Sequence, residues 1–341
     1  MLRTIARLRS RIDWLRDGDA NTALFHLHAR HWKRKNFIPK LVANGNILTR
    51  QGDKEQAAFD FYNSLLGTAE QRDISIDLEQ LELPPQDLQE LDAFFTKEEV
   101  WETIKGMPSD KAPGPEGFTG RFYKSCWPII KSDIMAALIA VQCGNIQNLW
   151  MLNSVFLTLI PKKKAADQVK DFRPISLIHS FAKLVTKILA NQLARKLHDL
   201  VANNQSVFVK GRCIQDNFML VQQTAQFFHQ QKLPRILLKL DITKAFDSVS
   251  WPFLLEVLRH RGFGDIISGI LFSSSTKILL NGSPGQEIQH QRGLRQGDPL
   301  SPMLFILVMD ILNAIVQKAN DMGLLQPLAR HPLQHRVSLC G

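Results

Sequence analysis

The sequence predicts an α+β fold, in which a small, largely antiparallel sheet is backed by helices. The first observation is two stretches with apolar residues at helical spacing, 181–201 and 298–319. The second is the order of elements from residue 235 onward: a β-rich stretch, a short helical stretch, a hairpin and then the long apolar helix. This arrangement of helices and strands is typical of the α+β class.

Three helices have recognisable ends. Thr96 and Glu99 have the spacing of a capping box, which predicts a helix from Thr96 to Gly106. Pro252 and Gly262 bound the short helical stretch 250–263. For the long apolar helix we expect Asp298 as N-cap and Pro299 at the first helical position.

The strands are shorter and less sharply bounded. LTLIP (157–161) and RILLKLDI (235–242) are rich in β-forming residues. The stretch 276–291 contains Asn281-Gly282, the dipeptide that favours a two-residue hairpin turn. The final RVSLCG (336–341) has the pattern of a further strand. The resulting sheet is expected to carry Asp241 at the end of one strand.

Charge and composition divide the chain into four predicted regions. Residues 1–66 form a basic, mostly helical segment, and 67–95 form an acidic linker. Residues 96–234 and 235–341 follow as two larger units. The net charge is +7 over residues 1–40, −9 over 67–102 and +13 over 103–341. Two basic regions around an acidic connector favour a polyanion partner, nucleic acid first, with a solvated basic surface as the alternative.

Composition excludes several other classes of protein. The longest apolar run is about seven residues, Met303–Met309, which is far too short to span a bilayer. The N-terminus lacks the apolar region of a secretory signal, so an intracellular location, nucleus or cytoplasm, is expected. The 4 cysteines are widely spaced, which indicates neither a disulfide framework nor a zinc site.

Asp241 is the first candidate for chemistry. A carboxylate at the end of an apolar strand is costly to bury without a partner, and a metal ion is one such partner. A single aspartate cannot clamp two divalent ions, so a two-metal site would need more carboxylates. Capping of the following turn is the alternative role for Asp241. Asp247 is a possible second ligand, but we expect it rather to cap the helix that carries Trp251.

The loop QRGLRQGDPLSP (291–302) is the second candidate. Gly293 and Gly297 allow close approach of the backbone to a ligand, and Arg292 and Gln296 add charge and hydrogen-bonding groups. The loop leads into a helix N-terminus, which favours phosphate. A hairpin-to-helix connector that simply needs glycine is the alternative.

Basic residues in two further loops suit a phosphate backbone. Lys162, Lys163 and Lys164 follow the strand 157–161, and Arg173 lies in the extended stretch after them. Lys111 opens the Pro- and Gly-rich KAPGPEGF. Each of these is also explained by an ordinary solvated loop.

The order of the motifs is more specific than any one of them. The chain contains, in order, GPEGF, LIPK, DFRPISL, QSVFVKGR, DITKAFDSVSW and RGLRQGDPLSPMLF. This set resembles the reverse transcriptases of non-LTR (LINE-type) retrotransposons, of the plant-like kind. Residues 13–41 resemble the segment that joins the endonuclease to the polymerase in such elements. The resemblance implies a right-hand-like polymerase fold, with fingers at 96–234, an incomplete palm at 235–341 and no thumb.

The resemblance also assigns roles to single residues. Asp241 matches the first catalytic, metal-binding aspartate, and Ile242 the residue whose carbonyl helps to hold the metal. Phe246 matches the aromatic gate against a 2′-hydroxyl. The remaining residues implied to bind nucleotide are Gln296, Gly297, Arg292, Lys162 and Arg173. Those implied to bind nucleic acid are Lys111, Lys163, Lys164, Lys210 and Arg212. The implied reaction is Mg²⁺-dependent addition of deoxynucleotide triphosphates to a DNA primer on an RNA template.

One departure from the family pattern limits this expectation. The resemblance implies a Tyr/Phe-Ala-Asp-Asp motif after RVSL, but Cys340 and Gly341 stand where that motif would begin. The chain is therefore expected to be a reverse transcriptase fragment that is inactive alone. A non-catalytic RNA- or DNA-binding remnant and a fragment of an intron-maturase-like polymerase are the alternatives.

Overall fold

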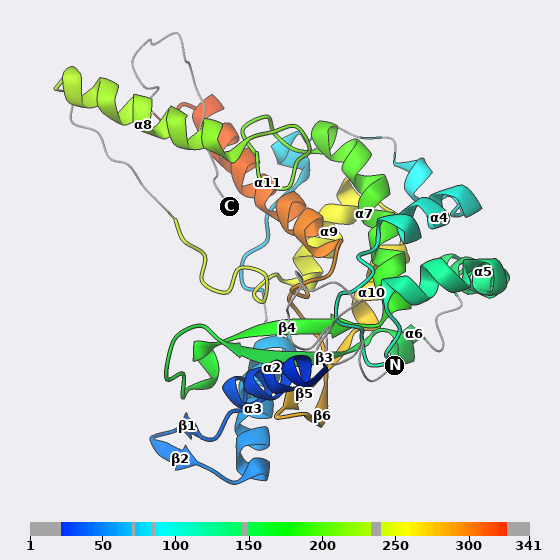
Figure 1. The fold of residues 1–341 in the computed structure, drawn as a ribbon. Coiled ribbons are helices and arrows are strands. Elements are labelled where there is room, and N and C mark those ends of the chain that lie inside the picture. The colour runs from blue at the N-terminus through cyan, green and yellow to red at the C-terminus, as the bar shows by residue number, and fades with distance from the viewer. Residues whose placement is uncertain are drawn as a thin grey trace.

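The structure, a computed structural model, describes residues 22–69, 72–83, 86, 88–144, 149–232 and 240–325. It is a mixed fold of helices and sheet, as the α+β prediction requires (Figure 1). The α-helices are α2 (Thr22–Lys35), α3 (Gln51–Leu66), α4 (Lys97–Gly106), α5 (Gly120–Gln142), α6 (Leu149–Leu152), α7 (Ser180–Leu200), α8 (Ile214–Gln230), α9 (Trp251–His260), α10 (Ile266–Phe272) and α11 (Ser301–Asp321). The strands are β1 (Leu41–Ala43), β2 (Asn46–Leu48), β3 (Ser154–Pro161), β4 (Phe172–Ile178), β5 (Ser275–Leu280) and β6 (Ser283–Gln289). Short 3-10 helices are η2 (Glu79–Leu81), η3 (Gln89–Leu91) and η4 (Val169–Asp171).

The central sheet has four strands in the order β4-β3-β5-β6. β3 pairs antiparallel with β4 and parallel with β5, and β5 pairs antiparallel with β6. The largely antiparallel sheet is thus confirmed. Asn281 and Gly282 form the predicted turn between β5 and β6, with φ angles of 55° and 98°. Both values lie in the left-handed region that this dipeptide tolerates well.

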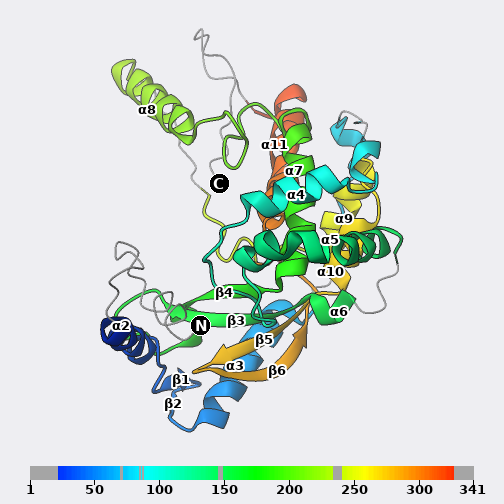
Figure 2. The same cartoon turned by 45° about the vertical axis from the view of Figure 1, so that its right-hand side comes forward.

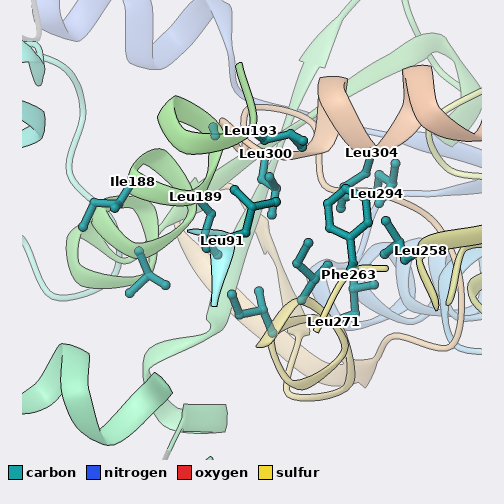
Figure 3. Close-up of a cluster of buried hydrophobic side chains, with 14 of the residues drawn as sticks. Leu91, Ile188, Leu189, Leu193, Leu258, Phe263, Leu271, Leu294, Leu300 and Leu304 are labelled. Atoms are coloured by element: carbon teal, nitrogen blue, oxygen red, sulfur yellow. The ribbon is translucent and has the colours of Figure 1, made fainter. Parts of the chain in front are cut away.

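Helices pack on the sheet and on one another. α3 lies against β5 and β6 (Figure 2), where its Tyr62 joins a cluster with Leu157 and Leu280. On the other side α7, α9, α10 and α11 enclose the largest apolar core (Figure 3). Ile188 and Leu193 of α7 and Leu304 of α11 are all buried there. α8 extends away from this body in both views (Figures 1 and 2).

α11 is the predicted long apolar helix. By length and composition alone it is the one helix in the described part of the chain that could cross a membrane. Its Leu304 and Leu307 are buried in the core. Its Asp310 forms a buried ion pair with Arg261, with 2.9 Å between Nη2 and Oδ2. These contacts are those of a core helix that packs against α7 and α9.

Local signals predicted helix ends with mixed success. Thr96 caps α4 by accepting a hydrogen bond from the Glu99 N–H at 3.2 Å, and α4 ends at Gly106 as predicted. The prediction for α11 is wrong, because its N-cap is Leu300 rather than Asp298. Asp298 instead accepts a hydrogen bond from the Leu300 N–H and pairs with Arg295 at 3.4 Å. That ion pair holds Asp298 in the loop before the helix.

The structure adds detail to the predicted regions. The basic first region contains the β1–β2 hairpin between α2 and α3, so it is not helical throughout. In the predicted acidic linker, Leu88, Leu91 and Phe95 are buried in the main core, and Figure 3 shows Leu91 among the leucines of α7. The four proposed boundaries stay predictions. Most of the strand predicted at 235–242, and all of RVSLCG, lie outside the described residues.

Candidate nucleotide and nucleic-acid site

Two distant loops run side by side in the structure. The Leu294 N–H donates to the Phe246 carbonyl at 2.7 Å, and the Gly293 N–H donates to the Val249 carbonyl at 2.8 Å. Ser250 and Arg292 add an antiparallel bridge. We call residues 244–250 and 291–298 together the motif junction. It joins the two stretches that the sequence singled out separately.

Gly293 makes this close pairing possible. Its φ is 83°, a left-handed value that side chains rarely adopt. A Cβ at this position would lie 2.8 Å from the Asp247 carbonyl oxygen. The Gly293 carbonyl accepts a hydrogen bond from Trp251 Nε1 at 2.8 Å. The left-handed φ and the close approach of the Asp247 carbonyl therefore require glycine at position 293, as expected for a loop glycine.

Asp247 lies buried at the centre of the junction. Gln296 Nε2 donates to its Oδ1 at 3.4 Å. Burial raises the pKa of Asp247, and the Gln296 hydrogen bond and the charges of Lys244 and Lys162 act in the opposite direction. Lys162 and Gln296, both predicted to bind nucleotide, thus approach one carboxylate. The expected helix-capping role is wrong, because α9 has Ser250 as N-cap and no side-chain cap.

The aromatic and metal-binding candidates occupy different surroundings. Phe246 is half-buried and stacks on Phe305 of α11, with ring centroids 4.8 Å apart. Asp241 and Ile242 are exposed and lie outside any strand. No group of three His, Cys, Asp or Glu residues that could hold a metal occurs in the part of the chain that the structure describes. The metal-binding roles of Asp241 and Ile242 stay predictions.

The Gln296–Gly297 turn also touches the sheet. The Ser176 N–H of β4 donates to the Gln296 carbonyl at 3.4 Å. Gly297 has a φ of 98° and lies next to the Ser176 carbonyl. Arg173 is exposed on the same strand. β4, which carries the exposed cation of Arg173, thus lies at the edge of the motif junction.

Several predicted binding cations are engaged by the protein itself. Lys162 Nζ donates to the Lys170 carbonyl at 2.9 Å, and Lys163 pairs with Asp171 at 2.9 Å. Arg292 donates to the Leu65 and Ser64 carbonyls at the end of α3.

Two other predicted contacts lie near the start of α8. Arg212 donates to the Ala202 and Gln205 carbonyls at 2.6 and 2.7 Å. Lys210 is exposed, as is Lys164 after β3. The roles of all these residues in binding nucleotide or nucleic acid stay predictions. Arg212 and Arg292 each donate hydrogen bonds to backbone carbonyls, which gives them a structural role.

Sequence reasoning missed a second basic site. A cavity of about 340 Å³ is lined by Lys111, Lys183 and Lys187 together with Gly297 and Pro299. We call it the lysine pocket. Only Lys111 was among the candidates, because Lys183 and Lys187 occupy the polar positions of α7 and resemble a solvated helix face. Their four-residue spacing was the one available signal.

The comparisons with known proteins fit this geometry. Residues 160–327, which include β4 and the whole motif junction, match the family model described as reverse transcriptase (RNA-dependent DNA polymerase). The chain thus contains a reverse transcriptase domain at residues 160–327. More specifically, its domain is that of non-LTR retrotransposon proteins.

Three relatives support the assignment to non-LTR retrotransposon proteins. The chain is 29% identical over 325 residues to the "Transposon TX1 uncharacterized 149 kDa protein" of Xenopus laevis, covering 92% of this chain and 24% of the relative. It is 30% identical over 229 residues to the Pol polyprotein of the type-2 retrotransposable element R2DM of Drosophila melanogaster, covering 63% and 21%. It is 28% identical over 236 residues to that of the type-1 element R2 of Popillia japonica, covering 67% and 32%. The chain thus spans a third or less of each relative. The plant-like affinity stays a prediction.

Proposed function

We propose that this chain supplies the fingers and part of the palm of a retrotransposon reverse transcriptase. The reaction would add deoxynucleotides to a DNA primer 3′-OH along an RNA template. One observation carries the proposal. The motif junction brings Phe246 and Gln296 into one loop pair and places Lys162 close to its buried Asp247. The resemblance assigns Phe246, Gln296 and Lys162 to one nucleotide pocket.

The chain's own residues would position the nucleotide and its charge. Phe246, held by Phe305, presents a fixed ring edge to the sugar, and Lys162 and Arg173 offer cations to phosphates. Mg²⁺ is the metal we propose, and it would neutralise phosphate charge when bound. Asp241 and the Ile242 carbonyl supply only part of such a site. We therefore propose that the 341-residue chain does not extend a primer by itself.

The partners follow from the same site: RNA template, DNA primer and deoxynucleotide triphosphates, in the nucleus or cytoplasm. The relatives reported above are named as transposon and retrotransposable-element proteins. This favours a retrotransposon polymerase over an intron-maturase-like one. A non-catalytic remnant differs from the proposal in a measurable way, because no added carboxylates would restore its polymerisation.

The test is primer extension on an RNA template. The 341-residue chain is compared with a fusion to the part of the R2DM polyprotein that follows the matched segment. We expect extension by the fusion alone and its loss in Asp241→Ala, whereas Asp133→Ala, an exposed carboxylate on α5, keeps it. Phe246→Val should increase ribonucleotide incorporation relative to deoxynucleotide. A folded but inactive fusion, or activity that survives Asp241→Ala, would contradict the proposal.

A further inference from the structure

The lysine pocket is formed by three elements that are far apart in sequence. The loop 106–120 contributes Lys111, α7 contributes Lys183 and Lys187, and the turn after the junction contributes Gly297 and Pro299. Lys183 and Lys187 are one helical turn apart, so they share a face of α7. The cavity of about 340 Å³ has room for a nucleotide-sized group. Gln296 faces Asp247, and the next residue, Gly297, lines this pocket.

The charge in the pocket is unbalanced. Within the described ranges, none of the three lysines forms an ion pair, and no Asp or Glu lines the cavity. Burial and the charge of Lys111 lower the pKa of Lys183, and only Asp298 acts in the opposite direction. Asp298 is itself paired with Arg295. Like charges held close together in this way are stabilised by an anion between them.

The carboxylates of the loop are committed elsewhere. Asp110 pairs with Arg121 at 3.0 Å. Glu116 Oε1 accepts a hydrogen bond from the Ser180 N–H at 2.7 Å, and its Oε2 lies 2.8 Å from His179 Nδ1. The Glu116 contacts fasten the loop to the start of α7, and both carboxylates have partners other than the pocket lysines.

The loop is also held in one conformation. A Cβ on Gly114 would collide with the Ile178 carbonyl, and one on Gly120 with the Pro108 carbonyl. Proline at 108, 113 and 115 restricts the backbone further. A pocket whose walls are fixed before binding loses little entropy when it takes a ligand.

One wall of the pocket is aromatic. Phe118 lines the cavity, is 45% exposed and stacks on Phe122 with ring centroids 4.3 Å apart. An exposed ring beside clustered cations is the combination that binds single-stranded nucleic acid, in which bases stack and phosphates meet lysine. A bare phosphate site would not need this ring.

We propose that the lysine pocket binds phosphate groups through Lys111, Lys183 and Lys187, with a base against Phe118. The phosphates come either from the backbone of a single strand or from a free nucleotide or pyrophosphate. The first source rests on the proposed function, since a template strand would then pass Gly297 next to the nucleotide pocket. The chemistry of the pocket itself does not depend on that function.

The test measures binding of the 341-residue chain to a labelled single-stranded RNA of about 20 nucleotides by fluorescence anisotropy, at several salt concentrations. Each lost phosphate contact should reduce the slope of log affinity against log salt by about 0.7. We expect Lys183→Gln/Lys187→Gln to reduce the slope by about 1.4 and to weaken binding several-fold. Phe118→Ala should weaken binding and leave the slope unchanged.

The matched control is Lys97→Gln/Lys131→Gln, which removes two exposed lysines on α4 and α5 outside the cavity. An equal effect of both double variants would show general charge attraction and overturn the inference. Lys183→Arg/Lys187→Arg keeps the charge and should keep the salt slope. Circular dichroism checks that each variant is folded.

Competition separates the two sources. One outcome is that pyrophosphate or a deoxynucleotide triphosphate displaces RNA from the wild-type chain and no longer binds the double variant. In that case the pocket binds a free nucleotide or pyrophosphate. If neither competes at millimolar concentration while the lysine-dependent RNA slope persists, the phosphate belongs to a strand. If the affinity for RNA and its salt dependence are the same in the wild-type chain and all pocket variants, the inference is overturned, even when the fusion extends primers. Conversely, a fusion that binds RNA through the pocket and cannot extend primers contradicts the proposed function alone.

Discussion

The motif junction and the lysine pocket meet at Gln296 and Gly297, but they differ in how their charges are satisfied. In the junction, Arg295 is buried and paired with Asp298, and Asp247 is buried and hydrogen-bonded to Gln296. In the pocket, three cations surround an open cavity. Removing one partner of a buried pair leaves an uncompensated buried charge and destabilises the fold, whereas clustered cations around a cavity are available to a ligand. Changes in the junction should therefore alter stability, and changes in the pocket should alter binding.

The largest expected effect is at Arg295. Its Nη1 donates to the Asn153 carbonyl at 3.2 Å, and its Nη2 lies 3.4 Å from Asp298. Arg295→Met should lower the free energy of unfolding by about 3–5 kcal/mol, because it leaves Asp298 buried without a cation. Urea unfolding followed by tryptophan fluorescence measures this. The double variant Arg295→Met/Asp298→Asn should recover part of the loss. A single variant within about 1 kcal/mol of wild type would remove the contrast with the pocket.

His290, next to the junction, gives a pH-dependent effect. It is buried, its Nε2 lies 2.7 Å from Thr276 Oγ1, and burial and the Arg295 charge lower its pKa to about 3. The folded state therefore favours neutral His290. This contribution is present above pH 6.5 and is lost as the pH falls toward 3.

The matched comparison is wild type against His290→Gln. The stability difference between the two should shift by roughly 2 kcal/mol in favour of the variant between pH 6.5 and pH 5. Urea unfolding at each pH measures it. Parallel pH profiles would show that His290 is not held neutral in the folded protein.

Gly293 tests the backbone of the junction. Gly293→Ala places a Cβ 2.8 Å from the Asp247 carbonyl at a φ of 83°, so the paired loops must move apart. We expect a loss of about 1–3 kcal/mol, measured as a lower urea midpoint at unchanged m-value. Gly285→Ala in β6 is the control, because a Cβ there makes only an ordinary contact at 3.5 Å. Equal losses in both variants would mean that the close approach at Gly293 is not what matters.

Other parts of the molecule show what the sequence could predict. The cap at Thr96, the apolar spacing of α7 and the turn at Asn281-Gly282 depend on residues a few positions apart, and all three were predicted correctly. The order of the motifs also identified the family, because the six motifs are spread along a long part of the chain. Pattern reasoning thus works where the interacting residues are neighbours or the motif itself is specific.

The failures came from competing contacts, which for Asp247, Lys183 and Lys187 involve partners far away in sequence. Asp247 was expected to cap a nearby helix, but its partner is Gln296, and Asp298 was expected to cap α11, but Arg295 holds it in the loop. Lys183 and Lys187 resembled an ordinary helix face because the loop that completes their pocket lies more than 60 residues earlier. Local pattern cannot rank such competing contacts, since burial is decided by the tertiary fold. The metal-binding role of Asp241 stays a prediction.

The smallest expected effect on stability is at Lys183. Its pKa is lowered by burial and by the charge of Lys111, so at neutral pH its charged form is disfavoured in the folded state. Lys183→Gln removes that cost and the repulsion from Lys111, and should change the free energy of unfolding by less than about 0.5 kcal/mol, toward greater stability. Urea unfolding without ligand measures it. With saturating single-stranded RNA the order should reverse, because the wild-type chain gains more binding energy than the variant. A variant that is strongly destabilised without RNA would show that Lys183 supports the fold, and the contrast between junction and pocket would fail.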